Sequence, residues 1–332
     1  MATIKKIAKE SGFSPSTVSI VLSGKADERK ISDETRKLII NTAQKMGYRA
    51  NISARRLRSN QGSNVMISVF MALDRRASIM MHFLLGLQNA AVESEQPFEI
   101  VIHSYKSGTL HTFAETIALT NCAVICNASK EDMAFLDETQ FFVPIVLFLR
   151  QSKKYCSVDI NLYQAGAMAA NIFARRGHNH AVQLITESYY TGLDQTRAQF
   201  VETAGNHGMT VTRINETHDM KGGYNAGVVI AGMSPMPDCL FSGSSIMSIG
   251  ALHAFGKLGI KIPEQLELIS IGLENPEFEE YASVPISAIS VPVDVMAKEC
   301  IRLLFLQLDG KIETPVNIEV PITYIQRESC GS

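Results

Sequence analysis

Tryptophan is absent from the 332-residue chain, and aromatic residues make up only 7% of it. No uninterrupted apolar run is long enough to span a bilayer, and the N-terminus has no apolar signal-peptide core. The lack of a long apolar run and of a signal-peptide core excludes a membrane-spanning or exported protein. The sequence therefore predicts a cytoplasmic chain with no membrane partner.

Cysteine is scarce and carries no metal-binding pattern. The six cysteines form no C-x-x-C pair. Cys122 and Cys126 lack the His or Cys partners that a zinc site needs. We expect reduced, mostly buried thiols, with no metal and no cofactor.

Enzyme motifs are missing as well. No G-x-G-x-x-G stands between a strand and a helix, and no G-x-S-x-G elbow is present. The eight His residues form no H-E-x-x-H pattern. The sequence therefore predicts a protein that is not an enzyme.

Charge is distributed unevenly along the chain, although the net charge is only -2. Residues 1–62 carry 13 Lys and Arg against 5 Asp and Glu, which leaves 18 against 28 for the remainder. A basic N-terminal part on an acidic body predicts a polyanionic partner at one end only.

The first 48 residues have the pattern of three short helices. Thr3 is placed to cap a helix from Ile4 to about Ser11, and Ser14 to cap a second that starts at Pro15 and ends near Leu22. Ser32 caps a third, for which we expect a buried face of Leu38, Ile39, Ala43 and Met46, with Gly47 as its stop. Two short helices with a tight turn and a third that closes the core predict a helix-turn-helix. A protein-docking module is the alternative, which the basic charge and the small polar residues of the second helix disfavour.

With these residues, the chain resembles the lac repressor/galactose repressor (LacI/GalR) family of bacterial transcription regulators over nearly its whole length. The resemblance implies a second helix in the DNA major groove, with Pro15, Ser16 and Ile20 at the base-reading positions. It places other side chains on the phosphate backbone: Thr3, Ser14, Thr17, Ser19, Ser23, Tyr48 and Asn51.

Two features of this region depart from the family pattern. Ile20 stands where the family usually has Arg, and Ile can only pack against a thymine methyl group or fill space. We therefore expect an altered base preference there. The loop from Lys25 to Ile31 is also longer than usual.

Residues 49–62 resemble the family's hinge helix, which folds on DNA. Leu57 is the expected minor-groove wedge, which with its dimer mate would part a base step and bend the duplex. Arg55 and Arg58 supply positive charge, and Ala54 permits a close approach.

The body, residues 63–332, alternates predicted strands and helices, which indicates an α/β fold with doubly wound parallel sheets. The expected strands are 65–72, 98–103, 123–127, 145–149, 181–186, 210–214, 239–242 and 268–272, with a final strand pair around 316–325. By resemblance to the family and to periplasmic sugar-binding proteins, the body forms two lobes. Lobe one is expected at about 63–161 and 292–322, and lobe two at about 162–291 and 323–332.

The family binds its effector between the lobes, and the corresponding positions here depart from the sugar-binding pattern. The candidate effector-binding residues are Asp74, Arg150, Arg197, Ser244, Ser245 and Glu274. Arginines suit phosphate or carboxylate groups, so a phosphorylated sugar or an organic acid is favoured over a neutral sugar. A protein co-regulator and a vestigial, ligand-insensitive core are the alternatives.

The chain also lacks the C-terminal leucine-rich helix of the family's tetramers, so we expect a homodimer on a pseudo-palindromic double-stranded operator. The resemblance implies repression more often than activation. An architectural DNA-binding protein without an effector is the remaining alternative.

Overall fold

The computed structural model describes residues 3–22, 26, 29–46, 65–73, 77–94, 96–186, 191–273, 277–312 and 314–331. By its internal contacts the chain divides into two compact units. The first comprises residues 1–73, 87–158 and 298–318, and the second comprises 74–86, 159–297 and 319–332. No helix within the described ranges is long and apolar enough to cross a membrane.

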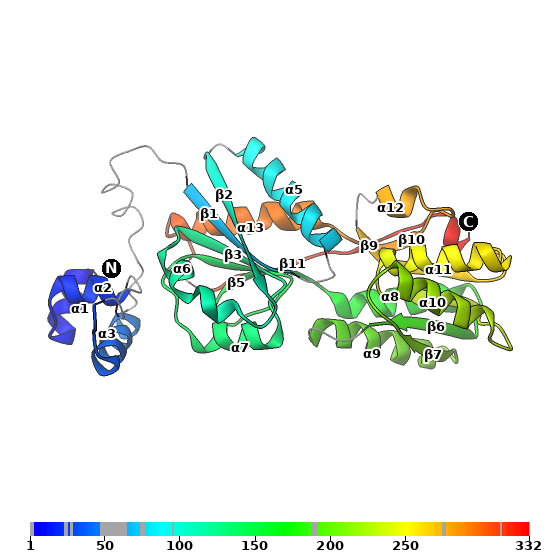
Figure 1. Ribbon diagram of the computed structural model, residues 1–332, viewed down its shortest axis with the longest axis horizontal. Coiled ribbons are helices and arrows are strands. Elements are labelled where there is room, and N and C mark those ends of the chain that lie inside the picture. Colours follow the sequence, from blue (N-terminus) through cyan, green and yellow to red (C-terminus); the bar gives the residue numbers. More distant parts are fainter. Residues whose placement is uncertain are drawn as a thin grey trace. The chain divides into compact units, whose positions relative to one another are not determined.

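The N-terminal head contains α1 (Ile4–Ser11), α2 (Pro15–Leu22) and α3 (Asp33–Lys45). The Thr3 hydroxyl accepts the Lys6 N–H at 3.3 Å, and the Ser14 hydroxyl accepts the Thr17 N–H at 3.0 Å, which confirms both predicted caps. Gly12 ends α1 at φ 76°, a conformation that favours glycine. Figure 1 shows the three helices as the blue part of the chain.

A small apolar cluster holds the three helices together. Its buried members are Ile7, Ala8, Val18, Val21, Ala26, Ile39 and Ala43. The expectation for Leu38 is wrong, since its side chain is 49% exposed. Ile39, Ala43 and Met46 follow the i, i+4, i+7 spacing of one helix face, and Leu38 lies about 100° around the helix from Ile39.

The first unit's sheet has the strand order β11-β5-β4-β3-β1-β2. The strands are β1 (Val65–Leu73), β2 (Phe98–Lys106), β3 (Cys122–Cys126), β4 (Ile145–Phe148), β5 (Cys156–Ile160) and β11 (Asn317–Val320). The helices around it are α5 (Ala77–Glu93), η1 (Leu110–Phe113), α6 (Ala114–Leu119), α7 (Lys130–Glu138) and α13 (Val293–Leu308). Figure 1 shows α5 and α13 on one face of the sheet and α6 and α7 on the other. The layers are those of a doubly wound sheet, as predicted.

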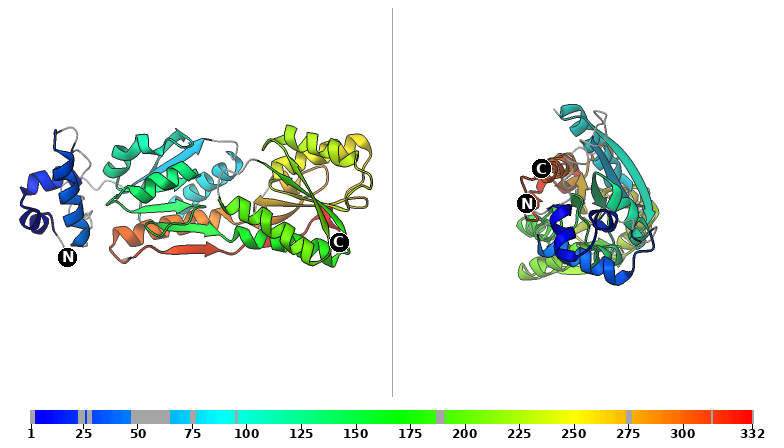
Figure 2. Two further views of the ribbon diagram at one scale, coloured as in Figure 1. Left: turned by 90° about the horizontal axis from the view of Figure 1, so that it is seen from below. Right: turned by 90° about the vertical axis from the view of Figure 1, so that its left-hand side faces the viewer.

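The second unit repeats this plan with the strand order β12-β10-β9-β8-β6-β7. Its strands are β6 (His180–Ile185), β7 (Thr210–Asn215), β8 (Cys239–Ser242), β9 (Glu267–Leu273), β10 (Ser287–Val291) and β12 (Thr323–Ile325). Its helices are α8 (Leu162–Arg175), α9 (Thr191–Asn206), α10 (Met220–Ala231), α11 (Ser245–Leu258), α12 (Glu277–Glu280) and η2 (Glu328–Cys330). The left view of Figure 2 shows α8 in green beside this sheet.

The two strands expected around 316–325 are both present, and they do not pair with each other. β11 joins the first unit's sheet beside β5, and β12 pairs antiparallel with β10 in the second. The two strands are separated by only Pro321 and Ile322, so the chain changes sheet within two residues. Local pattern predicts a strand, but its partner depends on tertiary contacts.

Close helix packing in the second unit depends on glycine. A Cβ atom at Gly250 of α11 would overlap the Met220 carbonyl oxygen of α10, and one at Gly223 of α10 would overlap the Met247 carbonyl of α11. A Cβ at Gly166 of α8 would likewise overlap the Thr196 carbonyl of α9. Both helix pairs therefore approach at backbone distance.

Candidate nucleic-acid interface and effector site

The outer face of α2 carries the residues predicted to read DNA bases. Of these, Pro15 and Ser16 are exposed and Ile20 is half-buried; Ser19, a predicted phosphate contact, is also half-buried. Val18 and Val21 face the opposite way, into the head's apolar cluster. Helix α2 therefore presents a small, uncharged surface held on two neighbouring helices.

The predicted phosphate contacts lie at the helix starts. Thr3 and Ser14 are exposed caps, and the Ser14 and Thr17 hydroxyls lie 2.9 Å apart in a hydrogen bond. Backbone N–H groups at a helix start attract anions, which suits phosphate. The other predicted DNA contacts lie outside the described residues: Ser23, Tyr48, Asn51, Ala54, Arg55, Leu57 and Arg58.

The positive charge of the head lies outside α2. The described head carries eight Lys and Arg residues against three acids, and all but Arg36 of the basic side chains are exposed. Helix α2 itself has no charged residue. The charges therefore supply sequence-independent attraction to a polyanion, and α2 supplies short hydroxyl and apolar contacts.

In each α/β unit, the candidate effector residues lie near the carboxyl edge of the parallel strands. The strand order reverses between β1 and β3 in one sheet and between β6 and β8 in the other, and ligands of open α/β sheets bind at such switch points. Arg150 follows β4, and Ser244 and Ser245 follow β8. Asp74 and Glu274 lie outside the described residues.

The Arg150 side chain contacts the backbone just after strands β3 and β4. Its side chain is buried, and Nε donates to the Ala128 carbonyl at 2.6 Å while Nη1 donates to the Leu149 carbonyl. Leu149 and Asn127, which follow β4 and β3, both have φ 57°. Non-glycine residues rarely adopt this conformation, and such strain concentrates at functional sites. Asn127, buried at this edge, is a candidate that sequence reasoning missed.

Arg197 lies on α9 in the second unit and is held by two neighbours. Its Nη2 donates to the Thr186 hydroxyl at 3.1 Å, and its Nη1 lies 3.8 Å from Asp194 Oδ1. Thr186 directly follows β6 and is buried. Sequence reasoning missed Thr186, because a single Thr after a strand is common.

Ser244 and Ser245 lie together at the start of α11. Ser244 caps the helix, and its hydroxyl accepts the Met247 N–H at 3.4 Å. The Ser245 hydroxyl donates to the buried carboxylate of Glu279 on α12. This edge therefore contains a carboxylate that was not among the predicted residues.

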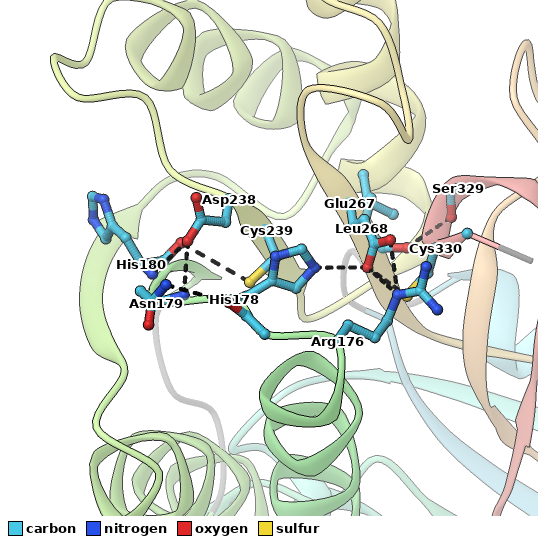
Figure 3. A network of polar contacts seen from close by, with 12 residues as sticks. Arg176, His178, Asn179, His180, Asp238, Cys239, Glu267, Leu268, Ser329 and Cys330 are labelled. Carbon is cyan, nitrogen blue, oxygen red and sulfur yellow. Dashed lines mark hydrogen bonds and ion pairs between the residues drawn. The ribbon is translucent and has the colours of Figure 1, made fainter.

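A separate polar network lies at the opposite, amino edge of the second sheet (Figure 3). The Glu267 carboxylate at the start of β9 accepts from Arg176 Nε and lies 2.8 Å from His178 Nε2. The Cys330 thiol donates to the same carboxylate, and burial raises the pKa of this thiol to about 12. Ser329 Oγ donates to the Leu268 carbonyl at 2.7 Å. The network fixes the C-terminal segment to the sheet and lies away from the candidate effector edge.

Comparison with known proteins agrees with both parts of this arrangement. Residues 3–51 match the model of bacterial regulatory proteins of the lacI family. Residues 170–330 match the periplasmic binding protein-like domain. The chain thus carries a lacI-type DNA-binding region and a periplasmic binding protein-like body. Within the described ranges, no group of three His, Cys, Asp or Glu residues could hold a metal ion.

Known transcription regulators are similar to this chain over most or all of its length. The HTH-type transcriptional repressor MelR of Bacillus subtilis is 26% identical over 348 aligned positions, which cover 100% of this chain and 98% of MelR. A lacI family transcription regulator from Clostridium acetobutylicum has 28% identity and a TM-score of 0.76, covering 80% of this chain and 100% of that structure. The lac repressor dimer bound to operator and the anti-inducer ONPF has the same fold, with 14% identity, a TM-score of 0.70 and coverage of 100% and 99%.

Proposed function

We propose that this chain is a homodimeric transcriptional repressor of the lacI family that binds a pseudo-palindromic operator through α2 and acts in the cytoplasm. The observation that supports this most strongly is the exposed face of α2, which Ser14 caps, on a head that carries seven exposed basic side chains. Its repressor relatives, such as MelR, extend over the same length of chain.

Operator binding is tested with the full chain and duplexes selected from a random pool. Specific affinity falls with salt, and log K against log salt has a slope of about −0.9 per phosphate contact. A flat salt response, or the absence of any enriched sequence, would contradict the proposal.

Homodimer formation is supported by exposed apolar side chains on neighbouring helices of the second unit. They are Met220, Val228 and Val229 on α10, Leu258 on α11, Phe278 on α12, and Tyr281 just after it. Large apolar side chains that are exposed on neighbouring helices are typical of an interaction site. Sedimentation analysis of Tyr281→Glu and Val229→Glu tests the assignment: both lower the dimer fraction, while an exposed Lys261→Glu control does not.

We further propose that a small effector binds at the carboxyl edges and changes operator affinity. A ligand must prefer one conformation of the protein to have this effect. Arg150 and Arg197 favour a phosphorylated sugar or an organic acid. A thermal-shift screen tests this, because a ligand at 100 times its Kd adds about 2.7 kcal/mol of stability. The expected hit is an anionic metabolite whose effect is lost in Arg197→Ala.

A second candidate is a repressor controlled by a protein co-regulator or one with a ligand-insensitive core. One observation favours it: the Arg150 guanidinium already donates to two backbone carbonyls. Glu279 also places a carboxylate beside Ser245, which disfavours an anion there. Silence across a panel of sugars, sugar phosphates, organic acids and nucleobases would support this candidate over a small effector.

A further inference from the structure

Ile20 is the unusual residue of the candidate DNA-binding surface. Of the apolar side chains on α2, Val18 and Val21 are buried in the head's cluster and Leu22 packs against it. Within the described part of the head, Ile20 lies outside that cluster and remains half-buried. The head thus keeps a branched apolar side chain out of its core.

Helix geometry directs Ile20 away from the core. Ile20 and Ser16 are four residues apart and therefore share one face of α2. Val18 lies two residues from each, about 200° around the helix, and is fully buried. Ser16 and Ile20 consequently form the outermost part of the helix.

The chemistry of α2 limits what it can recognise in the major groove. Its sequence is Pro-Ser-Thr-Val-Ser-Ile-Val-Leu, without an amide, guanidinium, ammonium or carboxylate side chain. Bidentate contacts to guanine from Arg, or to adenine from Asn or Gln, are therefore unavailable from this helix. The hydroxyls of Ser16 and Ser19 can bond to several bases and discriminate weakly.

We infer that Ile20 recognises the C5-methyl group of a thymine, so that the operator carries a T·A pair at the position facing this residue in each half-site. That methyl group is the apolar group that the major groove presents. A β-branched side chain on a helix has one strongly preferred χ1 rotamer, so little side-chain entropy is lost on contact. This inference rests on the proposed function, because it assigns α2 to the major groove.

The test replaces single thymines of the selected operator with deoxyuridine, which removes only the methyl group. In each half-site we expect one thymine whose replacement lowers the affinity of the full chain for the operator about fourfold. This is the loss expected when one methyl group is removed from an apolar contact. Replacing that T·A pair with 5-methylcytosine·G restores the methyl group, so it binds more tightly than unmethylated C·G by a similar factor.

The variant Ile20→Ala links the methyl group to this side chain. With Ile20→Ala, the thymine-to-uracil ratio at that position falls to about one, whereas Ser19→Ala, a neighbour on the same helix, keeps the fourfold ratio. Circular dichroism confirms that both variants retain helix.

Three outcomes would overturn the inference while specific, salt-dependent binding persists. They are a selected operator without thymine facing α2, no uracil effect at any position, or an effect that Ile20→Ala leaves intact. Loss of all sequence-specific binding by the unaltered chain would instead contradict the proposed function.

Discussion

Arg176 Nε lies 2.8 Å and 2.7 Å from the two carboxylate oxygens of Glu267, 91 residues away in the chain. Glu267 is buried, and it also accepts from Cys330 in the C-terminal segment. Burial would raise the pKa of Glu267, but the hydrogen bonds from Arg176, His178 and Cys330 outweigh it and lower the pKa below its ordinary 4.5. The second unit is therefore stabilised by a charged carboxylate at the amino edge of its sheet.

This relationship predicts a pH-dependent loss in Glu267→Gln. Because the folded-state pKa lies below the unfolded value, the carboxylate contributes stability above about pH 4.5 that is lost as pH falls through the folded pKa. We expect Glu267→Gln to lower the free energy of unfolding by about 3 kcal/mol at pH 7. Urea unfolding at several pH values between 3.5 and 7 measures the difference in the free energy of unfolding between the two proteins. A difference between the two proteins that does not shrink in acid would contradict the assignment.

Glycine packing gives a prediction with a control in the same helix. Gly250→Ala forces a Cβ against the α10 backbone, so we expect the second unit to lose about 2–3 kcal/mol. Gly256→Ala is the control, because nothing lies within 4 Å of its added Cβ, and alanine favours a helix. Denaturant unfolding should show opposite signs for the two variants; equal effects would refute close approach at Gly250.

A substitution at Arg150 distinguishes a structural role, through its hydrogen bonds to backbone carbonyls, from a role in ligand binding. Arg150→Met removes donors to Ala128 and Leu149, so we expect a loss of about 2–3 kcal/mol without any ligand present. The exposed Arg213→Met on β7 is the control, with an effect within about 0.5 kcal/mol. Thermal unfolding of the ligand-free chains measures both effects. If Arg150→Met leaves the stability unchanged, Arg150 has no structural role and serves ligand binding alone.

The hinge prediction concerns operator DNA. Leu57→Ala should reduce both DNA bending and specific affinity, because the smaller side chain cannot part a base step. The thermal unfolding of the protein should stay unchanged. Gel mobility of circularly permuted operator fragments measures the bend, and normal bending by Leu57→Ala would show that another residue is the wedge.

Some features of the site could be predicted from local sequence. Thr3 and Ser14 were predictable caps, because a hydroxyl before a helix satisfies backbone N–H groups within three residues. The caps and the apolar spacing of α1 and α2 together predicted the helix-turn-helix. The alternation of strands and helices predicted doubly wound sheets, and the family resemblance implied their division into two lobes.

Other elements gave weaker local signals. The helix α7 was not predicted, although Ser129 and Asp132 form a capping box at its start. The Asp132 carboxylate also accepts the Gly108 and Leu110 N–H groups. These partners lie 22 or more residues away along the chain, so local sequence does not predict them. Strand β10 was missed because Ser287 and Ser290 interrupt its apolar residues, yet all five of its residues are buried.

The sequence by itself determined the helix caps, the basic head, the alternation of strands and helices along the chain, and the uncharged character of α2. These features depend on contacts within a few residues or on composition. The tertiary structure decided that β12 pairs antiparallel with β10 and that Glu279 faces Ser245. It also decided that the Asp132 carboxylate accepts the Gly108 and Leu110 N–H groups. Each of these depends on which distant surfaces pack together, and burial is a property of the folded chain as a whole.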